Sequence, residues 1–501
     1  MRNPEYVLNS LAMKSSDSNY QFQRIYRNLY NPRFYDLAYQ KLVNRFPEKR
    51  HPNLFPGQIK SLIQELKNET YQPESLLGFK KKGRLQDSLV AIIVRMLLEA
   101  MYEGAFSSLS HGYRSRRSSH TALWQVKQNF SGVKWMVHGT LHSFFPAISF
   151  EVLRSILRKR ISDAKFIRLI NKFLRAGWME DWQFRRTYSG NPVGGWISPV
   201  LVNIYFHELD QYVEGLISGF CQGKKRRKNP DYESLLFQIK QLEKRMCQMK
   251  NGSEKEKLLR QKQYLYKRLE NTPVEDPWDP SYKRLAYVRY AGEILLGVIG
   301  SKKESFRIRD QVAAFLQQEL NIPLSREQMA LNHAKKHTRF LGYDITVNEQ
   351  CKLILPKDIW IKRLHRFGAV KEQNGNLKPV HKKELVQLSD AEILHVYNRE
   401  TMRLYNYYRL AENVSNLSRF SHLMKYSMYK TLAMKYKSSV RKILKKYMHE
   451  GRFLVPAETG DGKKAFITFY DRGFQCNHHP IKESCLDLMN PSAKSLDKGK
   501  T

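Results

Sequence analysis

The segment YVRYAGEILLGVIGSKKE, Tyr287–Glu304, constrains the fold more than any other stretch of this chain. Apolar residues lead into a tight polar turn at Tyr290-Ala291-Gly292-Glu293, and apolar residues follow it. Two short apolar runs joined by such a turn predict a β-hairpin. Because both strands are apolar, we expect them to lie in a core, which leaves the turn as the part available for chemistry.

Patterns of both helix and strand surround this hairpin. Residues 133–148 predict a buried strand that runs into a helix, and residues 339–347 predict a pair of strands. A glycine-rich turn followed by a helix is expected at 189–213. Apolar residues at helical intervals predict further helices at 1–75, 85–106, 149–177 and 306–320. The mixture indicates an α+β fold.

The sequence changes in character from about residue 352. A linker rich in Lys, Asn and Gly is expected at 368–383, and an aromatic, basic helical region follows at 390–450. Within that region one helix face is predicted to carry Leu432, Tyr436, Val440, Ile443 and Tyr447.

A helical hairpin is expected as an insertion at about 231–271. Apolar residues from Leu235 to Met249 alternate spacings of four and three, and Asn251-Gly252-Ser253 supplies a turn before a second charged helix. A single solvated helix is the alternative.

Charge narrows the choice of partner. The chain of 501 residues has 86 Lys and Arg against 47 Asp and Glu, which gives a net charge of +39. Such a surface favours a polyanion, so nucleic acid is the leading candidate and a charged membrane surface the weaker one. The basic clusters are Lys80, Lys81 and Lys82; Arg114, Arg116 and Arg117; and residues 224–228. Each could contact phosphate, or could be an ordinary solvated face.

Targeting signals and cysteines bear on the compartment. No run of about 18 apolar residues is present, and the first 20 residues contain no apolar signal-peptide core. Five scattered cysteines fit a reducing interior. We therefore expect a soluble, cytoplasmic protein if the gene is bacterial, and an organellar one if the gene is encoded in an organelle.

Six segments together resemble one family in their order along the chain. They are SHGYRSRRSSHTAL, KWMVHGTLHSFFPAI, IRLINKFLRAGWMEDW, YSGNPVGGWISPVLVNIYFHELD, YVRYAGEILLGVIGS and RFLGYDI. This order resembles the fingers and palm of group II intron reverse transcriptases of the bacterial type. Two later segments, YNYYRLAENVS and MKYSMYKTLAMKYKSSV, resemble the maturase domain of the same family.

The resemblance implies a right-hand polymerase fold followed by a helical thumb and maturase domain. The implied divisions are N-terminal helices and fingers at 1–130, a palm at 131–350 and the thumb and maturase domain at 351–455. A tail at 456–501 would be the remnant of an endonuclease. The family copies intron RNA into DNA and also binds that RNA so that it folds and splices.

The polymerase positions implied by the resemblance are degenerate. The family uses three aspartates as ligands for two Mg²⁺ ions, which require charged oxygen donors. The corresponding residues here are Thr140, Gly292 and Glu293, and a later acidic position is Pro146. We interpret the hairpin as the remnant of a metal site. A turn that never bound metal, and a site in which Glu293 still holds one ion, are the alternatives.

Three further departures accompany this loss. The turn that resembles G-x-P-Q-G-G has Val193 in place of the polar glutamine, and a family lysine aligns with Gln328. A fingers motif of the type R-P-L-G-I-P is missing between Gly83 and the next helix. All three reduce the polar contacts expected around template and nucleotide.

RNA binding does not depend on those ligands. In the region 390–450, tyrosines alternate with cations, a combination that suits structured RNA. The cations that lie off the predicted apolar face are Lys430, Lys437, Arg441 and Lys445.

A C-x-H-H-x5-C pattern near the end comprises Cys476, His478, His479 and Cys485. It could be a zinc site, but no second cysteine pair follows, so no metal centre and no working endonuclease are expected.

These features favour a maturase-like protein that binds a group II intron RNA and assists its splicing, a pseudoenzyme derived from a mobile element. Contact with DNA is possible, no membrane partner is expected, and the oligomeric state is left open. No cofactor is expected, except Mg²⁺ if polymerase activity remains. The alternatives are an active RNA-directed DNA polymerase and a decayed product without function.

Overall fold

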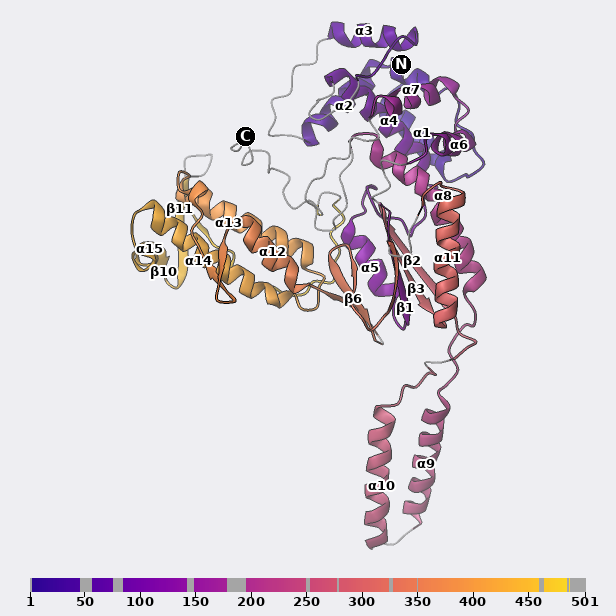
Figure 1. Cartoon of the computed structure of the whole chain (residues 1–501), viewed down its shortest axis with the longest axis vertical. Helices are drawn as coiled ribbons and strands as arrows, with labels where there is room; N and C mark the ends of the chain where they lie inside the picture. The colour runs from indigo at the N-terminus through magenta and orange to yellow at the C-terminus, as the bar shows by residue number, and fades with distance from the viewer. Residues whose placement is uncertain are drawn as a thin grey trace.

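A four-stranded antiparallel sheet forms the centre of the computed structural model (Figure 1). Its strands lie in the order β2 (Arg284–Tyr290), β3 (Glu293–Ile299), β1 (Trp135–Thr140) and β4 (Met329–His333). The predicted hairpin is therefore confirmed as β2 and β3. All seven residues of β3 are buried. A strand covered on both faces has no need of alternating polar residues, which explains its continuous apolar sequence.

The structure describes residues 2–45, 56–74, 84–141, 148–177, 195–248, 253–276, 279–323, 328–348, 350–458, 464–483 and 486. Within these ranges helices and small antiparallel sheets are mixed, so the α+β class is confirmed.

One face of the central sheet packs against α8 (Ser198–Phe220) and α11 (Lys302–Gln318), and the N-terminal helices continue this core. Among them α4 (Leu85–Tyr102) is apolar around most of its circumference, because α1, α2 and α8 all contact it. The other N-terminal elements are α1 (Pro4–Ser15), η1 (Tyr26–Tyr30), α2 (Pro32–Arg45), α3 (Pro56–Lys67), α6 (Phe150–Arg160) and α7 (Ala164–Arg175).

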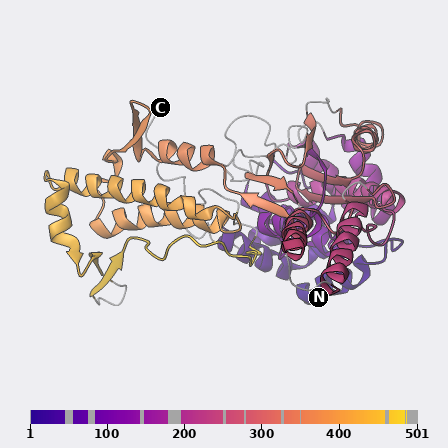
Figure 2. The ribbon, with the colours of Figure 1, turned by 90° about the horizontal axis from the view of Figure 1, so that it is seen from below.

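The opposite face packs against α5 (Ser119–Asn129) and a second sheet of β5 (Thr338–Phe340), β6 (Tyr343–Val347) and β7 (Cys351–Ile354). The apolar core on this side continues without interruption into the C-terminal helices. These are α12 (Lys357–Phe367), α13 (Asp390–Tyr408), α14 (Leu417–Lys435) and α15 (Val440–Tyr447). Figures 1 and 2 show this part of the chain as an extension to one side of the sheet.

Short elements complete the C-terminal half. They are η4 (Lys383–Leu385), η5 (Val414–Asn416), and a small sheet of β10 (Met448–His449), β11 (Arg452–Glu458) and β12 (Lys464–Thr468).

Two expectations for this half are wrong. The segment 368–383 is not a simple linker, because β8 (Val370–Gln373) and β9 (Asn376–Pro379) pair as a hairpin. Its turn, Asn374-Gly375, has positive φ at both residues, which is the backbone that an Asn-Gly pair favours.

The continuous helix expected through residues 432–447 is also wrong. α14 ends at Lys435, Lys437 adopts a positive φ of 42°, and α15 begins at Val440. Ser439 caps the new helix by accepting a hydrogen bond from the backbone N–H of Lys442. Tyr436 consequently lies 41 % exposed at the break rather than in the core.

The insertion is a pair of helices, α9 (Pro230–Cys247) and α10 (Ser253–Glu270), which project away from the central sheet (Figure 1). They contact one another along a small apolar core of Leu235, Ile239, Leu242 and Leu265. We call this pair the arm.

In the described part of the chain, no helix is both long and apolar enough to cross a bilayer.

Candidate functional site

The β2–β3 turn and the end of β1 lie next to one another. In the register of β1 and β3, Thr140 is directly opposite Glu293, and the backbone N–H of Leu141 donates to the carbonyl of Gly292 at 2.6 Å. The three positions selected from the sequence are therefore brought together at one end of the two central strands, β1 and β3. Pro146 and Val193 lie outside the described residues.

The Glu293 side chain points away from solvent and is 5 % exposed. Its Oε2 accepts a hydrogen bond from the backbone N–H of Leu341, at 3.2 Å, in the turn between β5 and β6. The same oxygen lies 3.5 Å from Nε2 of His138 on β1. This carboxylate is thus committed to contacts inside the protein.

These residues do not fit a pair of Mg²⁺ ions. Two such ions need several charged oxygen ligands in octahedral geometry. Here Thr140 offers a neutral hydroxyl, Gly292 offers no side chain, and the Glu293 carboxylate already accepts from Leu341. Across the ranges that the structure describes, no group of three or more His, Cys, Asp or Glu side chains is arranged to hold a metal ion.

A buried ion pair supports the hairpin from behind. Arg289 is 0 % exposed and donates to both carboxylate oxygens of Asp210 on α8, each at 2.7 Å. Tyr287 donates to the same carboxylate at 2.9 Å. Burial lowers the pKa of Arg289, but the Asp210 carboxylate and Tyr287 together raise it more, so the net shift is upward and the guanidinium stays charged.

The same guanidinium also holds the turn itself, since it donates to the carbonyl of Ala291 at 3.0 Å. Ala291 has a φ of 53°, a left-handed backbone that is uncommon for a residue with a side chain. A further donation to the Ser110 hydroxyl at 2.7 Å connects the turn to the loop before α5.

Gly112 in that loop makes the closest approach to the turn. A Cβ atom at Gly112 would lie 2.2 Å from the backbone nitrogen of Ala291. Only glycine permits this packing, because any side chain would overlap the turn backbone.

The basic residues predicted to contact RNA have different surroundings. Lys80, Lys81 and Lys82 lie outside the described residues. The structure places Arg114 in the interior and not on the surface, because its side chain is 5 % exposed and donates to Glu103 at 2.9 Å and to the carbonyls of Ser107 and Ser110. These hydrogen bonds tie a loop together.

The neighbouring Arg116 and Arg117 are more exposed to solvent than Arg114, and to different extents. Arg117 is half-buried and donates to the carbonyls of Ser108 and Ser110. Arg116 is exposed, with a φ of 56°. Of the original cluster, Arg116 is the one whose side chain faces solvent.

Some of the cations in the basic loop at 224–228 make contacts within the protein at the base of the arm. Arg227 pairs with Asp276 at 2.6 Å, and Lys228 lies 3.7 Å from Glu233. Arg226 donates to the carbonyl of Gly132 at 3.3 Å. Lys224 and Lys225 are exposed.

Three of the four C-terminal cations face solvent, namely Lys437, Arg441 and Lys445. The fourth, Lys430, is half-buried and donates to the carbonyl of Pro379 in β9 at 2.8 Å. Lys430 therefore stabilises the β8–β9 hairpin.

Sequence reasoning missed Asp390, the first residue of α13, as an organising group. Its carboxylate accepts from Lys435 at 2.6 Å, from Tyr436 at 2.6 Å and from Tyr447. These bonds join α13, the end of α14 and the end of α15. The signal in the sequence was only a capping box, Ser389 to Glu392, which predicts a helix start and no tertiary contact. Lys446 lies 4.1 Å from the centre of the Tyr436 ring, so a cation covers the exposed aromatic.

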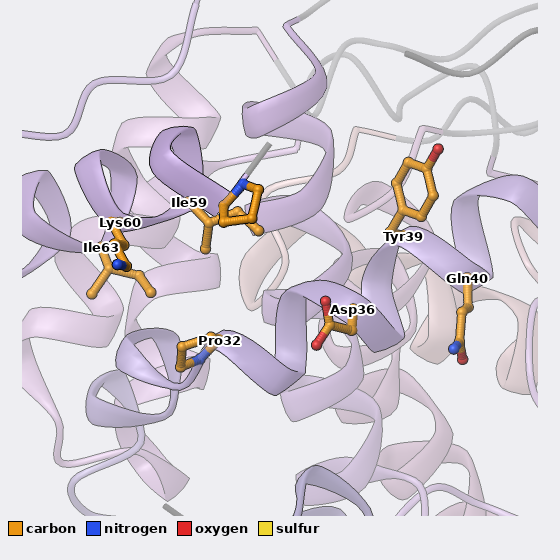
Figure 3. A pocket seen from close by; sticks show the side chains of 8 residues that line it. Pro32, Asp36, Tyr39, Gln40, Ile59, Lys60 and Ile63 are labelled. Carbon is orange, nitrogen blue, oxygen red and sulfur yellow. The ribbon is translucent and has the colours of Figure 1, made fainter. Parts of the chain in front are cut away.

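A cysteine–histidine pair and a cavity lie away from the β2–β3 turn. Sγ of Cys476 lies 3.9 Å from Nδ1 of His478, and Cys485 lies outside the described residues. A cavity of about 520 Å³ lies between α2 and α3, and its lining shares no residue with the β2–β3 turn. Figure 3 shows the lining side chains that come from α2, among them Asp36, Tyr39 and Gln40, and those that come from α3, among them Ile59, Lys60 and Ile63.

Comparison with known proteins identifies the family. The chain is 34 % identical over 502 residues to the group II intron-encoded protein LtrA of Lactococcus lactis, covering 92 % of this chain and 83 % of LtrA. The chain belongs to the group II intron-encoded proteins. Residues 348–468 of this intron-encoded protein match the family described as type II intron maturase.

More distant relatives of this intron-encoded protein come from eukaryotes. The COX1/OXI3 intron 2 protein of Saccharomyces cerevisiae is 31 % identical and covers 76 % of this chain and 46 % of its own length. Nuclear intron maturase 2 of Arabidopsis thaliana is 24 % identical and covers 54 % of this chain and 39 % of its own length. The maturase match contains α12 to α15, where Asp390, Arg441 and Lys445 lie.

Proposed function

We propose that this protein binds the RNA of a group II intron and assists its folding and splicing, and that its polymerase site no longer transfers nucleotides. The central sheet would be the palm of a right-hand polymerase fold, the N-terminal helices its fingers, and α12 to α15 its thumb and maturase domain. Membership of the group II intron-encoded proteins supports this assignment.

The surface of α15 is the observation that carries the proposal. This short helix buries Ile443 and Tyr447 and leaves its cations exposed. The exposed cations are Arg441, Lys442, Lys445 and Lys446. Within the described part of the chain, none of the four lies within 4.0 Å of a carboxylate oxygen.

Cations presented in this way suit a polyanion. Four positive side chains on one helix repel each other unless phosphates or counterions neutralise them. Each Lys or Arg that replaces a counterion on RNA adds to the salt dependence of binding. Splicing itself needs no protein nucleophile, because the intron RNA carries out its own chemistry.

The number of metal ligands supports the proposed loss of polymerase activity. One carboxylate, on Glu293, stands where the resemblance implies three, and it already accepts from Leu341. RNA binding needs no cofactor on the protein, and Mg²⁺ would matter only for residual nucleotide transfer.

The test is a splicing assay with the precursor transcript that contains the coding region of this protein. At low magnesium, wild-type protein should increase the splicing rate. Arg441→Gln with Lys445→Gln should weaken RNA binding on the order of tenfold and lower the slope of log K against log salt by about 1.5. The matched control is Lys303→Gln with Arg307→Gln, two exposed cations at the same spacing on α11. No gain in rate with wild-type protein would reject the proposal.

An active RNA-directed DNA polymerase is the second candidate. It is favoured by the one carboxylate that remains opposite Thr140, at the end of the two central strands of an intact sheet. Incorporation of labelled nucleotide on a primed RNA template distinguishes the two functions. If wild-type protein extends the primer and Glu293→Gln abolishes extension, the second candidate replaces the first for this site.

A further inference from the structure

The arm is fixed to the body at its base. Where it leaves the body, Gln222 and Lys283 exchange two backbone hydrogen bonds of 3.0 and 3.1 Å. Nearer the helices, the side chain of Arg227 pairs with Asp276, and the backbone N–H of Asp276 donates to the carbonyl of Arg227 at 2.9 Å. The carboxylate of Asp279 accepts from the N–H of Arg227 at 2.8 Å. The two chain segments that connect the arm to the body are thus bonded to each other at two places, one next to the body and one next to the helices.

Above this base, the arm is a pair of helices that projects from the body. α10 has 18 residues, so at about 1.5 Å per residue it is about 27 Å long. The helices hold each other through the four-residue apolar core and through the ion pair of Lys262 with Glu243 at 2.8 Å. Figure 1 shows the arm extending beyond the edge of the body, with its outer surfaces away from other elements.

The outward side of α10 is cationic along most of its length. No acidic residue occurs between Glu256 and Glu270. Apart from Lys262, which pairs with α9, the cations of this stretch are Lys257, Arg260, Lys267 and Arg268. All four are exposed, and their spacings of three, seven and one keep them on one side of the helix.

An aromatic side chain lies among these cations. Tyr264 is 61 % exposed and follows Arg260 by four residues, so it shares the same side. An exposed ring flanked by Lys and Arg can donate a hydrogen bond to phosphate or stack on an unpaired base. We call Lys257, Arg260, Tyr264, Lys267 and Arg268 the arm stripe.

We propose that the arm stripe is a second RNA-binding surface, which holds the phosphate backbone of the intron RNA at a distance from α15. This inference rests on the proposed function, because the RNA is the one that α15 would bind. A second copy of this chain is the poorer partner, since two stripes of the same sign repel each other. The hydrogen bonds at the base matter because a contact made by an anchored pair of helices loses less conformational entropy on binding than one made by a loose loop.

The first experiment measures the affinity for the precursor transcript as a function of salt. Lys257→Gln, Arg260→Gln and Lys267→Gln are combined in one full-length variant. Removing three phosphate contacts should weaken binding on the order of tenfold and lower the salt slope by about 2 to 3. Glutamine is a good helix former, so the arm should keep its fold, which circular dichroism checks.

The matched control removes three cations from the other helix of the same arm. Lys240→Gln, Lys244→Gln and Arg245→Gln change net charge equally, but these exposed cations share α9 with Glu233 and Glu243. Their loss should leave the salt slope within about 1 of the wild-type value. An arm-stripe variant with the affinity and slope of wild type overturns the inference, as does a control that loses as much as the stripe variant.

The second experiment places a photocrosslinking amino acid at position 264 of the full chain. Crosslinking to the transcript is expected, and crosslinking to another protein chain instead overturns the inference. The splicing assay separates the two proposals. If wild-type protein neither binds the transcript nor speeds its splicing, the proposed function and this inference fall together. If it does both while the arm-stripe variant matches it, the arm inference alone falls.

Discussion

Replacing Asp210 by asparagine should destabilise the protein strongly, because it leaves a charged Arg289 buried without its counterion. Arg289 is 0 % exposed and has two hydrogen bonds of 2.7 Å to this carboxylate. Removing one partner of a buried ion pair costs about 3 to 5 kcal/mol. Tyr287 would also lose its charged acceptor at 2.9 Å.

Thermal unfolding followed by circular dichroism measures the effect. For a cooperative unit of 150 to 250 residues, 1 kcal/mol shifts Tm by about 2 to 4 °C, so Asp210→Asn should lower Tm by roughly 6 to 20 °C. The companion variants are Arg289→Met and the double variant Asp210→Leu with Arg289→Met. Replacing both charges by apolar groups is often close to neutral, so the double variant should melt above either single variant.

Two results would refute this reasoning. A loss below about 1 kcal/mol in Asp210→Asn would mean that water or another group compensates Arg289. Single effects that simply add in the double variant would mean that the two side chains do not interact energetically.

Three further changes test other parts of the structure by the same melting assay. Gly112→Ala should lower Tm because its Cβ would overlap the backbone of Ala291. The control Gly215→Ala, whose Cβ would have no atom within 4 Å, should instead stabilise α8 by about 0.5 to 1 kcal/mol. Equal effects of the two substitutions on Tm would contradict the close packing at Gly112. Burial lowers the pKa of His120 to about 4, below its unfolded value near 6.5, so its contribution to stability should be full above pH 6.5 and fall by about 2 kcal/mol at pH 5. Burial lowers the pKa of His111 as well, so His120→Gln should remove about 2 kcal/mol of the loss at pH 5 and leave the rest; an unchanged pH dependence would contradict the cause. Glu293→Ala should lower the free energy of unfolding by about 1 to 3 kcal/mol, because the backbone N–H of Leu341 loses its hydrogen-bond acceptor. Glu293→Gln keeps an acceptor oxygen and should cost less. If Glu293→Gln cost more than Glu293→Ala, that hydrogen bond would have no structural role.

The sheet and the arm were predictable because their patterns are local. An apolar run on each side of a tight turn specifies β2 and β3, and spacings of four and three specify the seam of α9. The β8–β9 hairpin was also readable, since Asn374-Gly375 is a strong turn signal, but the surrounding lysines suggested a linker.

The break before α15 could not be inferred from periodicity. The residues on both sides keep the helical spacing, and what separates them is tertiary. Tyr436 and Tyr447 both donate to Asp390, a residue more than forty positions earlier in the chain. The Ser439 cap is the local trace of this break.

Charge alone also could not assign the basic residues. Arg114 and Arg116 look alike in the sequence, yet the first is enclosed by Glu103 and two carbonyls and the second faces solvent. The difference depends on where Glu103, eleven residues away, is placed by the end of α4. The same limit applies to α15 and the arm stripe, where the sequence supplies the cations and the structure shows that they face outward.

The separation of the apolar core of the arm from those of the body has a consequence for how the molecule comes apart. One hydrophobic cluster joins β3 to α14, so these regions should denature as a single calorimetric unit. The α9–α10 pair has four buried apolar residues of its own and few ties beyond its base, so it should fray at a lower temperature. Limited proteolysis should accordingly clip that projection first and leave a trimmed but folded particle.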